Sequence, residues 1–313
     1  MRRVWAFMAL VVALAACQKE QEKMDVIVGG EVDMVVNVNV PDNTRAGSEK
    51  GIFESGILES SDTTMRYTLQ VFYTDENNKT HKTEPQRKYD DSNSVAFDVR
   101  LTPNRDYTFV VWADVVKKND ADEWADWHYD TFNDETGQID LANITVIDNE
   151  WVAMDETRDA FTAKLLVEDF TSSSIINLNL HRPNAKLRVK ATDWDTTANM
   201  PTKANVTYTT AHRTAFNAYT GKAADASITK THKYTIDNIY NESDTERTLF
   251  SDYFFAGDEG DKVKFGLELL DNNNSVIKTL DFNTEISVKP NYLTTIEGNL
   301  LLSGEGNNTI TEN

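Results

Sequence analysis

Residues 95–116, VAFDVRLTPNRDYTFVVWADVV, decide the fold class of this chain. From Val95 to Leu101 apolar and polar residues alternate, which is the pattern of a β-strand with one buried face. Turn-forming residues from Pro103 to Asp106 then interrupt the alternation. From Tyr107 to Val116 the chain is almost continuously apolar, which predicts a strand at the centre of a sheet.

The same period of two recurs on both sides of this stretch. It predicts strands at residues 34–40, 65–73, 176–180, 187–191, 263–269 and 286–288. No long segment has a convincing helical period, and only minor helical turns are expected, near Leu141 and between Ala211 and Ala218. Antiparallel strands with one polar face pack best as sandwiches, so the sequence predicts an all-β protein.

The length of the chain predicts two such domains. A single seven-stranded sandwich would leave many residues unused, whereas two ordinary sandwiches fit. His181-Arg182-Pro183-Asn184 is the expected boundary, because its proline ends one strand and a basic strand begins just after it. We therefore expect an N-terminal sandwich over residues 32–183 and a C-terminal sandwich over residues 184–313.

The N-terminus has the pattern of a bacterial lipoprotein export signal. Met1-Arg2-Arg3 precedes an unbroken apolar run, and Leu14-Ala15-Ala16-Cys17 contains the only cysteine of the protein. The run is too short to span a bilayer, so residues 1–16 are predicted to be a signal peptide; a buried N-terminal helix is the alternative. Cys17 is then the predicted lipidation site, followed by an acidic tether to residue 31, and no disulfide framework is expected.

The charge of the chain excludes two classes of partner. The formal net charge is −20 and the pI is about 4.6, with the acidic residues spread along the sequence. Nucleic-acid phosphates and anionic lipid headgroups would repel such a chain.

A search for catalytic and metal-binding motifs finds little. None of the 5 histidines has metal-ligand spacing to another histidine or to the cysteine, and there is no glycine-rich phosphate loop or nucleophile elbow. We therefore expect no enzyme activity, no cofactor and no metal.

One acidic cluster stands beside aromatic residues. Residues 120–130 contain five carboxylates together with Trp124 and Trp127. Aromatic rings stack on sugars and carboxylates bind hard cations, so a glycan or calcium site is one interpretation. An exposed acidic loop with its tryptophans tucked beneath it is the other.

Several motifs, in order, carry a resemblance to a known family. They are the segment ending at Cys17, the strand 32–40, Asn43-Thr44-Arg45-Ala46, Trp112-Ala113-Asp114, the stretch 182–188, the stretch 215–221 and the stretch 291–301. Together they resemble the fimbrillin-like surface lipoproteins of Bacteroidales, over nearly the whole chain after Cys17. The resemblance implies two tandem transthyretin-like antiparallel β-sandwich domains and a part in surface fimbriae or cell adhesion.

The resemblance also implies a route of assembly. In polymerising members a protease cuts after an arginine, an early strand leaves, and a strand of the next subunit takes its place. Arg45 matches the cleavage arginine here and Ala46 would become the new N-terminus, with Lys50 as a competing basic site. The alternative is an uncut loop whose strand stays paired. The tail after Leu302 contains few large apolar residues and would be a poor donor, which favours an anchoring or accessory subunit.

Two further resemblances concern export and modification. Residues 18–22 resemble the acidic surface-export tag of Bacteroidetes lipoproteins, which implies display on the outer membrane; a plain linker is the alternative. Asp62-Thr63-Thr64 and Asp195-Thr196-Thr197 resemble their O-glycosylation signal, with Thr63 and Thr196 as acceptors.

The sequence thus predicts a lipid-anchored outer-membrane protein exposed at the cell surface, with a structural or adhesive role. Its expected partners are other fimbrial subunits or a second copy of itself, joined by strand addition, and a host protein or glycan. The rivals are a non-polymerising surface lipoprotein that binds a glycan or host protein through Trp124 and Trp127, and a surface hydrolase or nutrient-capture lipoprotein.

Overall fold

The structure, a computed structural model, describes most of the chain after residue 29. The described residues are 30–41, 58, 60–133, 136–147, 152–224, 227–229, 231–236, 243–302 and 308–312. Their named elements are β-strands and the short 3₁₀ helix η3 (Glu156–Arg158), and they contain no α-helix. None of the helical segments in this part of the chain has the length and apolar character to cross a membrane. The predicted all-β class is confirmed.

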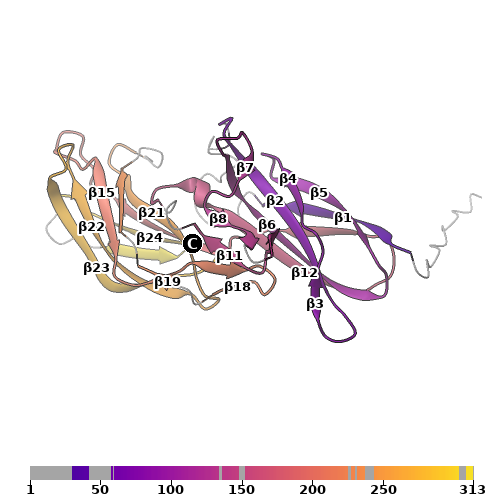
Figure 1. Cartoon of the computed structure of the whole chain (residues 1–313). Helices are drawn as coiled ribbons and strands as arrows, with labels where there is room; N and C mark the ends of the chain where they lie inside the picture. The colour runs from indigo at the N-terminus through magenta and orange to yellow at the C-terminus, as the bar shows by residue number, and fades with distance from the viewer. Residues whose placement is uncertain are drawn as a thin grey trace, which may run out of the picture.

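The first sandwich packs two sheets face to face (Figure 1). Sheet I has the order β13–β1–β5, with β1 (Val32–Asn39), β5 (Ser94–Leu101) and β13 (Ile175–Asn179). Sheet II has the order β12–β6–β2–β3, with β4 also paired to β2 and β7 to β6. Its strands are β2 (Thr63–Thr74), β3 (Thr80–Lys82), β4 (Gln86–Tyr89), β6 (Arg105–Lys118), β7 (Trp124–Ala125) and β12 (Ala160–Phe170). Alternate residues of both sheets, among them Val36, Tyr67, Phe97 and Phe109, fill a fully buried core between them.

The second sandwich also consists of two sheets. Sheet III has the order β19–β16–β21–β14–β24–β25, and sheet IV has the order β20–β15–β22–β23. The strands are β14 (Asn184–Ala191), β15 (Lys203–Tyr208), β16 (His212–Arg213), β19 (Ser227–Ile228), β20 (Thr231–Thr235), β21 (Arg247–Phe255), β22 (Asp261–Leu270), β23 (Val276–Val288), β24 (Leu293–Gly298) and β25 (Asn308–Glu312). Leu187, Val206, Leu249 and Phe265 are buried in its core.

The two sandwiches repeat one topology. The order β12–β6–β2 in sheet II corresponds to β23–β22–β15 in sheet IV, and β13–β1–β5 corresponds to β24–β14–β21. In both repeats the first strand pairs antiparallel with one neighbour and parallel with the other: β1 is parallel to β13, and β14 is parallel to β24. Sheets I and III are therefore not purely antiparallel. The sequence could not show this, because side-chain alternation predicts a strand but not its direction.

A small additional sheet joins the sandwiches. It has the order β18–β17–β11–β8, with β8 (Tyr129–Asp130), β11 (Ile144–Val146), β17 (Ala215–Asn217) and β18 (Lys222–Ala223), and it lies between the two bodies in Figure 1. A hairpin of β9 (Phe132–Asn133) and β10 (Gln138–Ile139) adjoins it in sequence. Trp112, Phe216 and Phe255 meet in the core beneath it. This bridging sheet crosses the predicted boundary at residues 183/184, and it replaces the helical turn expected at residues 211–218, which was wrong.

Candidate functional site

The β1 position is the candidate assembly site. Alternation of valine and polar residues makes β1 a strand with one apolar face, and that face points into the core. The inward side chains of this segment are Val32, Met34, Val36, Val38 and Val40, each at most 7% exposed. β1 is aligned with β5 along its whole length and with β13 from Val35 to Asn39. Removal of β1 would therefore open a groove through the middle of sheet I.

The outer face of β1 carries polar contacts that fix its register. The Asn37 side chain donates to Asn177 Oδ1 at 3.0 Å, and Arg100 Nε donates to Asp33 Oδ1 at 2.9 Å. Both contacts are exposed, so they contribute little to stability. The affinity for this position comes from main-chain pairing and from the inward side chains.

Several predicted site residues lie outside the described residues. They are Cys17 with the signal peptide, Arg45, Ala46 and Lys50. β1 ends at Asn39, and the N–H of Val40 still donates to the carbonyl of Asn93 at 2.8 Å. Arg45 therefore follows within a few residues of the end of the strand that its cleavage would release.

The predicted tryptophan loop folds back on sheet II. Trp124 stacks on Tyr89 with ring centroids 6.0 Å apart, and Lys118 Nζ lies 5.2 Å from the Trp124 centroid. Trp127 stacks on His128 at 4.1 Å, and its ring also contacts a lysine. Both tryptophans are half-buried, whereas Tyr89 is 38% exposed. At this loop the Tyr89–Trp124 pair thus presents aromatic surface to solvent, and Tyr89 was not identified from the sequence.

Asp126 of this loop has a structural partner. Asp126 pairs with Arg66, and Arg66 also binds Asp114 through two hydrogen bonds of 3.0 and 2.8 Å. Arg66 and Asp114 are buried; burial opposes the charge of Arg66, but the two carboxylates outweigh it and raise its pKa. Within the described residues no group of three histidine, cysteine or acidic side chains is placed to hold a metal ion. The calcium interpretation therefore has no support in the geometry.

The two predicted glycosylation sites differ in their surroundings. Thr63 is the first residue of β2 and lies opposite Lys117, half-buried. Thr196 is exposed in a turn, where Asp195 Oδ1 accepts hydrogen bonds from the N–H and hydroxyl of Thr197 at 2.8 and 2.7 Å. Of the two, Thr196 is the more accessible to a modifying enzyme.

Buried ion pairs hold the two sandwiches together at η3. Glu156 Oε2 lies 2.9 Å from Lys186 Nζ, and Arg158 Nη1 lies 3.1 Å from Asp252 Oδ1.

Asp159 and Arg182 form a third pair at this junction. Arg182 Nη2 lies 2.6 Å from Asp159 Oδ2, and both side chains are buried. η3 directly precedes β12 of the first sandwich, whereas the partners of its pairs lie on sheet III or just before it. These pairs therefore fix the relative orientation of the sandwiches, and we name them the η3 latch.

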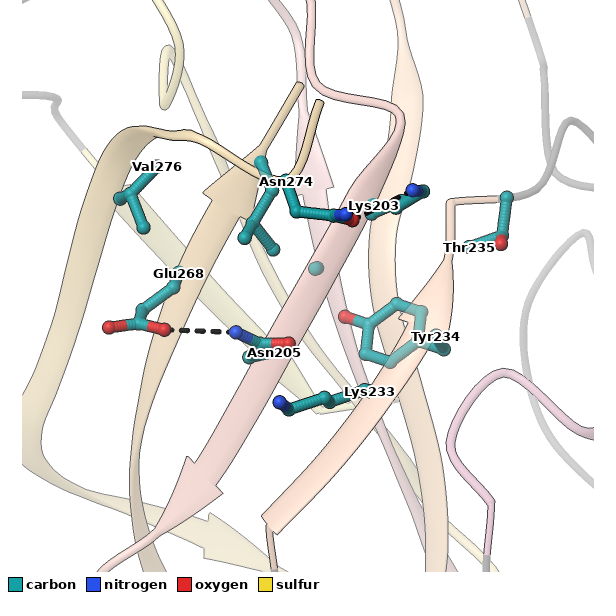
Figure 2. Close-up of a pocket in the computed structure, with 10 residues that line it drawn as sticks. Lys203, Asn205, Lys233, Tyr234, Thr235, Glu268, Asn274 and Val276 are labelled. Atoms are coloured by element: carbon teal, nitrogen blue, oxygen red, sulfur yellow. Dashed lines mark hydrogen bonds between the residues drawn. The ribbon is translucent and has the colours of Figure 1, made fainter. Parts of the chain in front are cut away.

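A shallow pocket of about 510 Å³ lies on the outer face of sheet IV (Figure 2). Lys203 Nζ donates to Asn274 Oδ1 at 2.8 Å, and Asn205 Nδ2 donates to Glu268 Oε2 at 3.0 Å. The lining contains one carboxylate and neither histidine nor cysteine. These side chains are not arranged as a nucleophile–base or acid–base pair.

The fold defines a protein of two similar β-sandwiches. In each sandwich the first strand, β1 or β14, lies between two other strands of its sheet. A family model matches residues 24–313, and the chain belongs to that family, which is described as a family of unknown function (DUF6562). The comparison with curated protein sequences gave no match.

Solved structures share this fold. A putative cell adhesion protein from Bacteroides ovatus aligns with a TM-score of 0.51 and 14% identity, over 90% of this chain and 95% of the other. A structure from Bacteroides thetaiotaomicron, described as putative polysaccharide binding proteins, aligns with a TM-score of 0.50 and 10% identity, over 90% and 96%. The fimbrial anchor protein Mfa2 from Porphyromonas gingivalis gives 0.45 and 11%, over 90% and 97%. The first two alignments show that the chain shares its fold with Bacteroides proteins described as a cell adhesion protein and as polysaccharide binding proteins.

Proposed function

We propose that this protein is a non-enzymatic structural or accessory subunit of a fimbria-like adhesive assembly at the cell surface. In this proposal Cys17 is lipidated and holds the protein at the outer membrane. Support comes from the lipoprotein pattern of the sequence and from a fold shared with proteins described as adhesion proteins.

The observation that carries the proposal is the place of β1 in sheet I. It is a short strand near the N-terminus, hydrogen-bonded on both sides, with apolar side chains at alternate positions. An incoming strand with the same alternation could form the same main-chain bonds and fill the same pockets, which is the physics of β-strand addition. In the proposal cleavage after Arg45 permits this exchange.

The C-terminal strand supports an accessory or anchoring role over a donor role. β25 is already paired with β24 in the same chain, and its one large apolar side chain, Ile310, is 49% exposed. A strand with a single apolar anchor would fill few of the pockets that β1 now occupies. β24, by contrast, contributes Leu293 and Ile296 to the protein interior and is not free to be donated.

Mass spectrometry of the N-terminus of protein recovered from the cell surface tests the proposal, with Arg45→Ala and the matched control Lys50→Ala. Cleavage and exchange predict an Ala46 start and an SDS-resistant ladder, both lost in Arg45→Ala and kept in Lys50→Ala. A lipidated Cys17 on every molecule would refute exchange and leave the anchoring role. A protein that associates with no other surface subunit would refute both.

The Tyr89–Trp124 pair favours glycan binding as a second candidate function. Stacked aromatic rings at the surface suit the apolar face of a sugar, and one structural relative is described as polysaccharide binding. Binding measured on a glycan array should be lost in Trp124→Ala and kept in Trp127→Ala, whose ring already packs on His128. Binding that survives Trp124→Ala would refute this candidate.

A further inference from the structure

The outer edge of β13 is an unpaired sheet edge. In sheet I, β13 pairs with β1 on one side, and no strand of the described residues pairs with it on the other. The internal repeat makes this informative, because the corresponding strand β24 is covered by the antiparallel strand β25. Among the described residues, the first sandwich thus leaves open an edge that the second sandwich covers.

The β13 segment has none of the usual features that protect an edge strand from pairing. Edge strands are commonly protected by lysine, proline or a β-bulge. Residues 171–180, TSSSIINLNL, contain no charged residue and no proline, and the register with β1 is regular. The absence of charge stands out in a chain with 51 acidic and 31 basic residues. Two copies of a protein with net charge −20 repel one another, and this neutral edge is a place where they can approach.

Apolar side chains lie along the same side of the first sandwich. Ile175 is 66% exposed on the outer face of β13, and Ile176 on the inner face is only partly buried. Leu165 and Val167 of the edge strand β12 are also partly buried against the first core. The two edge strands lie on one side of the sandwich, because the main chain of Thr162, near the start of β12, pairs with that of His181, just after the end of β13. A strand added to β13 would cover these apolar groups.

We propose that β13 of one copy pairs antiparallel with β13 of a second copy about a two-fold axis at Asn177. This register uses the whole strand and places Ile176 of each copy opposite Leu178 of the other on the inner face. Asn177 meets its own counterpart on the outer face, so the amide contact between Asn37 and Asn177 continues across the axis. An interface around a two-fold axis is self-complementary, and the pattern of β13 meets that condition.

This contact is independent of the strand exchange proposed above. It leaves β1 in place, needs no cleavage and uses the outer edge of β13, not the central position of sheet I. The stability of this β13–β13 dimer also depends on salt concentration. Added salt screens the repulsion between the two acidic copies while the neutral strand contact is unaffected, so the dimer should become more stable as ionic strength rises.

Disulfide trapping in the full chain with Cys17→Ser tests the register. Asn177→Cys should give a covalent dimer on mild oxidation, because facing residues of an antiparallel pair lie within disulfide range. Asn283→Cys is the matched control, since Asn283 is an exposed asparagine of β23, the edge strand of sheet IV. Equal trapping of both variants, or none of Asn177→Cys, would overturn the proposal.

Analytical ultracentrifugation of the Cys17→Ser chain tests the partner surface without cross-linking. The dimer fraction should rise with salt and should be lost in Ile176→Lys, which places a charge on each side of the axis. Leu302→Lys, at an exposed site away from β13, should leave it unchanged. Loss of the dimer on deletion of residues 308–313 would instead identify β25 of the second copy as the occupant and refute β13–β13 pairing. A monomer at all salt concentrations would refute any self-association at this edge.

Discussion

The double substitution Val36→Ala with Val38→Ala tests whether β1 is held by its inward side chains. Val36 and Val38 are 0% and 1% exposed and belong to the first core. Each substitution removes two carbons, at about 0.8 kcal/mol per buried methylene, and leaves a small cavity that raises the cost to about 2 kcal/mol. The double substitution should therefore lower the free energy of unfolding by about 4 kcal/mol, a large share of the roughly 5–15 kcal/mol that stabilises a whole domain.

The assay is urea unfolding with hydrogen exchange of β1 and β5 to assign the transition to the first sandwich. A loss of about 4 kcal/mol corresponds to a fall in Tm of roughly 8–16 °C for a domain of this size. Val35→Ala is the matched control on the outer face of the same strand, and it should cost below about 1 kcal/mol. If the inner pair costs no more than this control, the reasoning about the β1 groove is wrong.

Three further predictions concern the buried charges. Arg66→Met should lower the free energy of unfolding in urea by about 3–5 kcal/mol, because it leaves Asp114 buried without its ion partner. Adding Asp114→Leu should recover much of this loss. Equal losses in the single and double variants would contradict the prediction. Arg182→Met should loosen the η3 latch at Asp159, seen as faster hydrogen exchange in η3 and a larger maximum dimension in solution scattering; unchanged exchange would contradict it. Burial lowers the pKa of His212 to about 4, so the unfolded chain binds the proton more readily, and stability should fall by up to about 3 kcal/mol as the pH drops from 6.5 to 4. His212→Gln should flatten that part of the stability–pH curve.

The sequence predicts the strands β1, β5, β13 and β22 because their burial alternates along the strand, but it does not predict β12, β15 or β21. The expected strand at residues 65–73 is β2 (Thr63–Thr74), and the apolar run at residues 107–116 lies within β6 (Arg105–Lys118). Like β21, β14 has no exposed face, since every one of its residues is buried. The two lysines and one arginine of β14 alternate with apolar residues, as they would on a strand with one exposed face. In the structure, however, the face with these basic residues lies against other parts of the protein and not against solvent.

The candidate site could be predicted only in part, for a physical reason. β1 was recognisable because its alternation is local, whereas the Tyr89–Trp124 pair joins residues far apart in sequence. In the sequence, the charged residues of the η3 latch cannot be distinguished from ordinary surface residues. The pairs Arg158–Asp252 and Asp159–Arg182 are buried, and only the three-dimensional arrangement supplies their partners.

The unequal widths of the sheets explain why both proposals fall on the first sandwich. Among the described residues sheet III has six strands, because β16, β19 and β25 extend the repeat unit on both sides, whereas sheet I has only three. A three-stranded sheet cannot cover the full face of the wider sheet II, and Leu165, Val167 and Ile176 are left partly exposed along one side. Apolar groups at an open sheet edge are stabilised by any added strand, so a narrow sheet favours association wherever charge permits it. Replacement of β1 and pairing at β13 are two ways in which sheet I could bind a strand of another molecule, one in its centre and one at its edge.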